Sequence, residues 1–180
     1  MNSNVQERRR QMLDLLEETR AETRSVLSSL DPEQVVHTDE RAWRVREVLG
    51  HLGVWNGEAA SSLEAHATGA EYHCVPSEQS YDDYNGAAVE ERRTWTINEV
   101  WAEYEQSHDR LRSIVEKMPA ERWDGSILYP WNEAGTVEGL VTIMMRHERE
   151  DHCEIILKAA GRKDRFRSND ASRAPAEWNG

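Results

Sequence analysis

Two places in this sequence hold side chains that could bind a metal ion. His51 stands among Val48, Leu52 and Trp55, and a polar run, His147-Glu148-Arg149-Glu150-Asp151-His152, interrupts an apolar segment. Imidazole nitrogens and carboxylate oxygens are ligands that divalent transition metals accept. A metal site could therefore form if the fold brings these two places together.

The polar run offers two ligand pairs. Residues four apart lie on one face of a helix, with Cβ atoms about 5–6 Å apart, so His147 pairs with Asp151 and Glu148 pairs with His152. Each pair supplies one imidazole and one carboxylate. Apolar stripes lead into both pairs, so periodicity leaves both open. The alternative interpretation is a hydrogen-bonded core histidine beside a solvated, ion-paired face.

The surrounding sequence predicts the helices that would carry these residues. Apolar residues recur at intervals of three and four in four long segments, which cover residues 5–30, 43–69, 97–118 and 137–160. Pro32 and Pro119 follow the first and third segments, and proline cannot continue a helix. Thr96 and Glu99 have the spacing of a capping box, and Thr136 has the position of an N-cap.

The links between these helices predict the topology. Residues 70–95 form a long connection, in which residues 81–92 predict a short helix. One long link and two short ones predict a crossover between the second and third helices. The expected fold class is therefore all-α, a four-helix bundle with a long crossover between helices 2 and 3. It covers residues 1–161, and residues 162–180 are expected to form a polar C-terminal tail.

The composition disfavours several classes of protein. The 180 residues suit one domain, and the net charge of -12 disfavours nucleic acid and anionic membranes as partners. No apolar run reaches the roughly 18 residues of a transmembrane helix, and residues 1–11 lack the apolar core of a signal peptide. Two cysteines do not make a disulfide framework. A cytoplasmic location is therefore expected. Seven Trp residues are expected to help fill the core.

Other residues are weaker candidates for chemistry. Cys153 follows His152 directly, but neighbours along a helix point about 100° apart, so we expect a buried thiol rather than a Cys–His pair. Residues 129–132 (Tyr-Pro-Trp-Asn) could line a pocket or form a packed turn. The pattern identifies no partner for His108.

Two motifs resemble those of a known family. The segment Trp43-Arg44-Val45-Arg46-Glu47-Val48-Leu49-Gly50-His51-Leu52 resembles the second helix of the DinB-like (damage-inducible, YfiT-like) superfamily. The segment Thr136-Val137-Glu138-Gly139-Leu140, followed by His147-x-x-x-Asp151-x-x-Glu154-Ile155, resembles its fourth helix. The similarity covers about residues 8–160 and extends to the mycothiol-dependent maleylpyruvate isomerases.

The resemblance implies a metal site. In this family one ligand comes from the second helix and two, four residues apart, come from the fourth, so the implied ligands here are His51, His147 and Asp151. The commonest form of the family has a second histidine where Asp151 stands. Glu148 and His152 stay open as the other pair.

The resemblance also implies a function. It indicates an enzyme that uses a divalent metal, zinc or nickel, and a low-molecular-weight thiol, mycothiol or bacillithiol. Such an enzyme would be a transferase or isomerase acting on a small electrophile, and a homodimer by analogy with its relatives. The alternative is a non-catalytic, protective bundle that binds a metal or a small molecule. A third interpretation is a structural dimer whose His/Asp cluster is an internal polar network.

Overall fold

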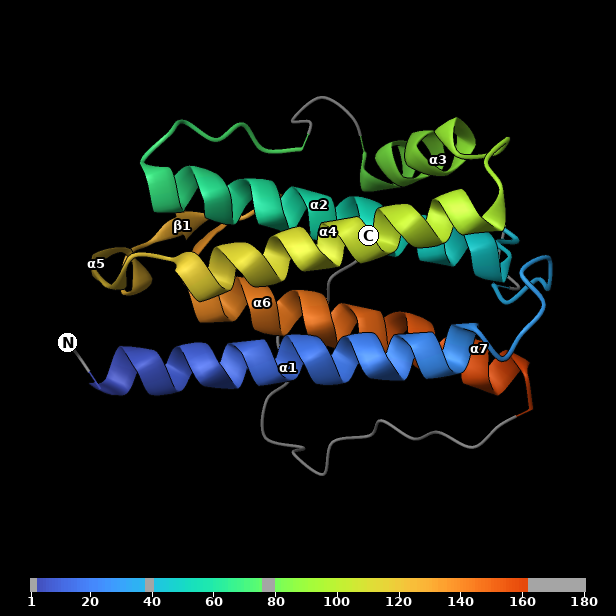
Figure 1. Ribbon diagram of the computed structural model, residues 1–180. Helices are drawn as coiled ribbons and strands as arrows, with labels where there is room; N and C mark the ends of the chain where they lie inside the picture. The colour runs from blue at the N-terminus through green and yellow to red at the C-terminus, as the bar shows by residue number, and fades with distance from the viewer. Residues whose placement is uncertain (1–2, 38–40, 76–79, 162–180) are drawn as a thin grey trace.

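Four long helical segments form the protein. The computed structural model describes residues 3–37, 41–75 and 80–161. The first three long helices are α1 (Ser3–Leu27), α2 (Val45–Thr68) and α4 (Ile97–Lys117). The fourth is composite and runs through α6 (Val137–Arg146), η1 (His147–Cys153) and α7 (Glu154–Ala159). The prediction of an all-α four-helix bundle is confirmed (Figure 1).

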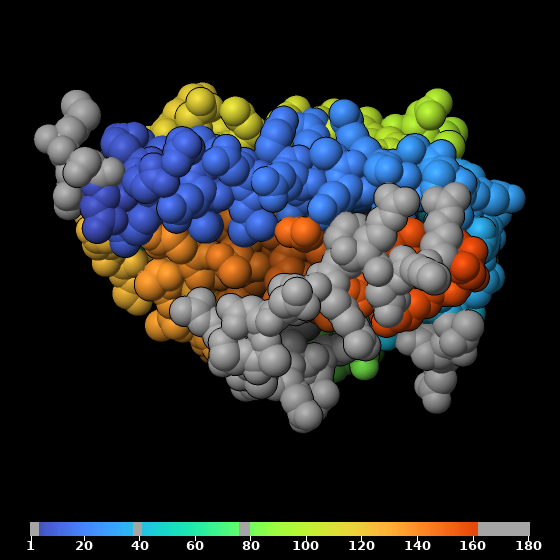
Figure 2. All heavy atoms as spheres, turned by 90° about the horizontal axis from the view of Figure 1, so that it is seen from below, coloured from blue at the N-terminus to red at the C-terminus, as the bar shows by residue number. Residues whose placement is uncertain are grey.

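The bundle has the predicted crossover. Both α1 and α2 pack against α4 and α6, so α1 and α2 lie at opposite corners. In Figure 1, α2 and α4 run in one direction, whereas α1 and α6–α7 run in the other. Parallel neighbours need a long connection, and residues 69–96, with the short helix α3 (Tyr81–Glu91), provide it between α2 and α4. Figure 2 shows α1 lying along α6 on one face of the molecule.

Local signals set most helix ends. The Thr96 hydroxyl accepts a hydrogen bond from the Glu99 amide at 3.3 Å, and the Glu99 carboxylate accepts one from the Thr96 amide at 2.6 Å, so the predicted capping box is confirmed. Gly69 ends α2 with φ +75°, a left-handed conformation that glycine adopts without strain. The first helix ends at Leu27, not Leu30, because its last turn tightens: the Leu30 amide bonds to the Leu27 carbonyl.

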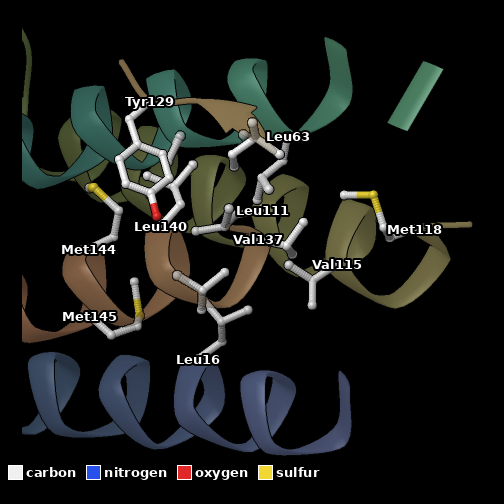
Figure 3. Packing of buried hydrophobic residues seen from close by; sticks show 14 of the residues in the cluster. Leu16, Leu63, Leu111, Val115, Met118, Tyr129, Val137, Leu140, Met144 and Met145 are labelled. Atoms are coloured by element: carbon white, nitrogen blue, oxygen red, sulfur yellow. The ribbon is translucent and has the colours of Figure 1, made fainter. Parts of the chain in front are cut away.

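Apolar side chains from all four segments meet inside the bundle. Figure 3 shows Leu16 of α1, Leu63 of α2, Leu111 of α4 and Leu140 of α6 pointing into one interior. Complete burial of such a side chain contributes about 1.5–3 kcal/mol. Four tryptophans are also buried, as expected: Trp43, Trp55, Trp123 and Trp131.

A short connection leads from α4 to α6. It contains α5 (Ala120–Trp123) and two strands, β1 (Ile127–Leu128) and β2 (Ala134–Gly135), which pair antiparallel. Within the residues described, no helix is both long and apolar enough to cross a bilayer. The tail that the sequence predicts at 162–180 lies outside the described residues.

The ring of Tyr129 fixes the start of α6. Its hydroxyl donates to the Thr136 carbonyl at 3.1 Å and accepts from the Thr136 amide at 3.0 Å. A Cβ atom on Gly135 or Gly139 would lie about 2.1 or 2.2 Å from atoms of this phenol group, closer than any real contact. A larger residue at either position would therefore force the ring or the helix to move, and α6 begins in a fixed place against the hairpin.

The last helix is not continuously α-helical, so that part of the prediction was wrong. Residues 147–153 form a π-helix between two α-helical parts. A π-helix closes hydrogen bonds between residues i and i+5 and is often found at functional sites. The spacing of four on which the sequence reasoning relied is therefore not the only one that brings side chains of this segment together.

Candidate metal centre

Three histidine side chains converge between α2 and η1. The Nε2 atom of His147 lies 3.2 Å from Nε2 of His51 and 3.1 Å from Nε2 of His152. One ligand atom from each of the three residues lies within 4.8 Å of both others. His51 and His152 are buried, and the His147 side chain is only 13% exposed. The fold thus brings the two places that the sequence singled out into contact.

The position of His51 follows from the apolar face of α2. Val48 and Leu52, which flank it on this helix, are buried in the core. The rings of Trp43 and Trp55 pack around its imidazole, with centroids at 5.1 Å and 6.4 Å. These neighbours hold the ring and shield it from water.

The π-helix explains why His147 and His152 share a face. In an α-helix, residues five apart point about 140° away from each other. In η1, the hydrogen bonds join residues i and i+5 and the turn is wider, so His152 comes round to the side of His147. The two rings are 4.5 Å apart, nearly perpendicular.

Asp151 lies on the other side of His147. Its Oδ2 atom is 3.0 Å from Nδ1 of His147, whereas the other two histidines face Nε2. This contact places a proton on Nδ1 and leaves the Nε2 lone pair pointing toward His51 and His152. The assignment of Asp151 as a ligand stays a prediction, because its carboxylate contacts the ring rather than the point where the three nitrogens meet.

The environment keeps the imidazoles of His51 and His152 neutral. Burial lowers the pKa of His51 and of His152 well below the ordinary value, and the nearby His147 and Arg41 lower the pKa of both further. Neutral imidazole is the form that binds metals, since protonation removes the lone pair.

The donor set fits a divalent ion better than it fits a hydrogen-bond network. A tetrahedral ion with bonds of about 2.0–2.1 Å holds its ligand nitrogens about 3.3 Å apart, close to the 3.1 and 3.2 Å from His147 Nε2 to the Nε2 atoms of His152 and His51. The single lone pair of His147 Nε2 cannot accept good hydrogen bonds from both neighbours at once. Three nitrogens gathered in this way could hold a shared cation.

Glu148 points away from the three histidines into the core. Its carboxylate is 1% exposed and accepts hydrogen bonds from Thr23, Tyr104 and Asn56. Burial raises its pKa, while the hydrogen bonds oppose that rise. Of the alternative pair Glu148 and His152, the structure therefore brings only His152 to the centre.

A small apolar pocket adjoins the centre. Its walls are two indoles, Trp55 and Trp131, two aliphatic side chains, Ile143 and Met144, and three polar residues at the histidine end, which are Arg146, His147 and Asp151. The Arg146 guanidinium lies 4.0 Å from Glu150, a weak ion pair at a largely open position. The pocket could hold the apolar part of a small molecule next to His147, and Trp131 belongs to the segment predicted to line a pocket.

A larger hollow lies elsewhere in the structure. It measures about 710 Å³, lies between α2, α3 and α4, and is lined by none of the three histidines. Arg92 is ion-paired with Glu103 there, and the Tyr84 hydroxyl donates a hydrogen bond to Glu58. Volume alone does not make it a site, and we place the chemistry at the histidines.

The two cysteines do not join the centre. Cys153 is buried, as expected, and burial raises the pKa of its thiol to about 12, so it is not a nucleophile near neutral pH. The Cys74 sulfur contacts the Tyr129 carbonyl at 3.5 Å and the Asn132 side chain at 3.7 Å.

Sequence reasoning named all three histidines but did not group them. It placed His152 with Glu148, because a regular helix pairs residues four apart. A signal that could have indicated this spatial grouping is that three histidines suit one metal ion as well as two histidines and a carboxylate do. His147 and His152, five residues apart, share a face only because this segment is a π-helix, and no pattern in the sequence indicates a π-helix here.

Comparison with known proteins agrees with the fold. A model of the DinB superfamily matches residues 15–156. A search among curated proteins finds no match. The fold is similar to that of the mycothiol-dependent maleylpyruvate isomerase, with a TM-score of 0.67 and 14% identity over 84% of this chain and 67% of that one. It is also similar to YfiT from Bacillus subtilis, described as a probable metal-dependent hydrolase with an unusual four-helix bundle topology, with a TM-score of 0.65 and 17% identity over 85% of this chain and 86% of that one.

Proposed function

The chain belongs to the DinB superfamily, and from this premise we propose that it is a divalent-metal-dependent enzyme. The ion would be held by His51, His147 and His152. The observation that carries the proposal is the convergence of three imidazole nitrogens within 4.8 Å of one another at a nearly buried position. The family resemblance and the two similar folds, one mycothiol-dependent and one described as probably metal-dependent, support it.

Three protein ligands leave coordination positions open, which is typical of catalytic rather than structural metal sites. A divalent ion held by these residues would lower the pKa of a bound thiol or water and so would supply a nucleophile near neutral pH. We propose that the thiol is mycothiol or bacillithiol and that it reacts with a small electrophile in a transfer or isomerisation.

The chain's own residues have separate tasks in this proposal. The three histidines supply lone pairs, and Asp151 keeps the His147 ring oriented through its Nδ1 proton. Trp43 and Trp55 exclude water from His51. The apolar body of the electrophile would occupy the pocket between Trp55 and Trp131.

Metal analysis of untagged protein tests the first part. We expect about one zinc or nickel ion per chain, lost in His51→Ala, His147→Ala and His152→Ala but retained in His73→Ala, which replaces an exposed histidine. Metal-free wild-type protein that also fails to take up added zinc or nickel would contradict the proposal and favour an internal polar network.

Turnover tests the second part. Wild-type protein with mycothiol or bacillithiol should consume a thiol-reactive electrophile such as a bromobimane faster than the thiol alone, and His147→Ala should not. Metal binding with equal rates for both proteins would favour the non-catalytic, protective bundle. A homodimer is also part of the proposal, and light scattering coupled to size exclusion measures it.

A further inference from the structure

We propose that Thr23 and Glu148 are positioning residues that hold the π-helical turn of η1 in place before any metal binds. This inference rests on the proposed function, because the turn is what brings His147 and His152 together. The feature that carries it lies on the core side of η1, opposite the three histidines. We call Thr23, Glu148 and Cys153 the Thr23 clamp.

The clamp repeats the spacing of the metal centre. Glu148 and Cys153 are five residues apart, and both contact the Oγ1 atom of Thr23 on α1, the Glu148 carboxylate at 2.5 Å and the Cys153 sulfur at 3.5 Å. His147 and His152 are also five residues apart, and both face His51 on α2. One turn of π-helix thus presents an i, i+5 pair to each of two neighbouring helices.

Two further donors anchor the Glu148 carboxylate. The Tyr104 hydroxyl of α4 donates to Oε1 at 2.5 Å, and the Asn56 amide of α2 donates to Oε2 at 3.3 Å. A buried carboxylate must keep such donors, since leaving it without hydrogen bonds is costly. Because the donors lie on three different helices, the position of Glu148 is fixed from three directions.

Fixing Glu148 also fixes His147, its neighbour in the chain. If η1 were α-helical, residues five apart would point about 140° apart, so Cys153 could not reach the hydroxyl that Glu148 contacts. His152 would also turn away from His147. The contacts of the clamp and those of the centre therefore require the same widened turn, and the clamp holds it with groups that are not ligands.

Thr23→Val tests this inference, and Thr19→Val is its matched control. Both threonines lie on α1 and are fully buried, but the Thr19 hydroxyl has no hydrogen-bond partner among the described residues. Valine keeps the shape of threonine and removes only the hydroxyl. Thr23→Ser keeps the hydroxyl and should therefore behave like wild type in both measurements below.

The first readout needs no metal. In metal-free protein, we expect amide hydrogen exchange over residues 147–153 to become about tenfold faster in Thr23→Val, and to stay within about twofold of wild type in Thr19→Val and Thr23→Ser. Equal exchange in both valine variants would overturn the inference. This result is independent of whether the protein binds metal at all.

The second readout uses Co²⁺ as the probe. We expect Thr23→Val to bind Co²⁺ about tenfold more weakly than wild type, as is typical when an outer residue that orients ligands is removed. Its visible absorption spectrum, which reports coordination geometry, should also change, whereas Thr19→Val and Thr23→Ser should match wild type. Unchanged affinity and spectrum in Thr23→Val would count against the clamp. Wild-type protein that binds no Co²⁺ would count against the proposed function, and hydrogen exchange would then decide the clamp alone.

Discussion

His152 lies five residues after His147, and their Nε2 atoms are 3.1 Å apart because the helix widens between them. This spacing brings two histidines of a polar run together, and with His51 from α2 they form the candidate metal centre. The same turn sends Glu148 into the core. His147 and Glu148 are adjacent in the chain, but His147 faces the other two histidines and Glu148 faces the core.

The ligand set can be tested by comparing His152 with Asp151. We expect His152→Ala to lose stoichiometric metal, because it removes a nitrogen that faces His147 Nε2. Asp151→Ala should retain metal but bind it roughly 10–100-fold more weakly, since it removes only the carboxylate that orients His147. Competition with a coloured chelator measures both affinities. Complete loss in Asp151→Ala with near-normal binding in His152→Ala would restore Asp151 as the ligand.

Chelation should lower the stability of the protein. A ligand present at 100 times its dissociation constant stabilises the folded state by about 2.7 kcal/mol, which for a domain of this size corresponds to a Tm change of roughly 5–11 °C. We expect wild-type protein to lose that much on treatment with a chelator in differential scanning calorimetry. His147→Ala should melt at the same temperature with and without the chelator, and a chelator effect in that variant would indicate a different metal site.

Much of the fold could be predicted because its signals are local. The capping box at Thr96 and Glu99 and the glycine end at Gly69 each depend on residues within one turn. The crossover followed from the unequal lengths of the links. These features can be predicted without knowing which helices pack against each other.

The geometry of the centre could not be predicted in the same way. Whether η1 is α- or π-helical depends on Thr23 and Tyr104, which lie 125 and 44 residues away from Glu148 in the chain. The sequence places Glu148 and His152 on one face only if the helix is regular. Tertiary contacts change that regularity, and so the grouping of the histidines was beyond local reasoning.

The close approach of Tyr129 to α6 predicts a specific sensitivity to an added methyl group. Gly139→Ala would place a Cβ about 2.2 Å from the Tyr129 hydroxyl, so the ring or the helix must move, at a cost of roughly 1–3 kcal/mol. Gly57→Ala is the control, because a Cβ there meets no atom within 4 Å and alanine favours a helix by up to about 1 kcal/mol. Urea unfolding measures both.

A second substitution, at Tyr129, tests whether the clash with its hydroxyl causes the loss of stability in Gly139→Ala. Tyr129→Phe removes the hydroxyl, so the double variant with Gly139→Ala should be less destabilised than the sum of the two single variants. The remaining ring carbon would lie about 3.5 Å from the new Cβ, an ordinary contact. Additive losses would show that the clash with the hydroxyl is not the source of the effect.

His108 predicts how stability depends on pH. Its ring is fully buried on α4, and its pKa is lowered to about 4. Burial is the main cause, Arg20 and Arg24 act in the same direction, and Glu105 and Asp109 oppose them. Neither ring nitrogen has a hydrogen-bond partner among the residues described. The imidazole is therefore neutral in the folded protein at neutral pH.

The direction of this pH dependence follows from whether the folded or the unfolded chain binds the His108 proton more tightly. The unfolded chain takes up this proton near the ordinary pKa of about 6.5, whereas the folded chain takes it up only near pH 4. Stability from this group is complete above pH 6.5 and is lost progressively as the pH falls toward 4, by up to about 3 kcal/mol.

Urea unfolding of wild type at several pH values between 7.5 and 4.5 should show this loss. His108→Leu should lose less stability than wild type over that interval, because its buried side chain does not titrate, while His73→Leu at an exposed position should follow wild type. Parallel curves for wild type and His108→Leu would mean that the imidazole is not buried neutral as the structure places it.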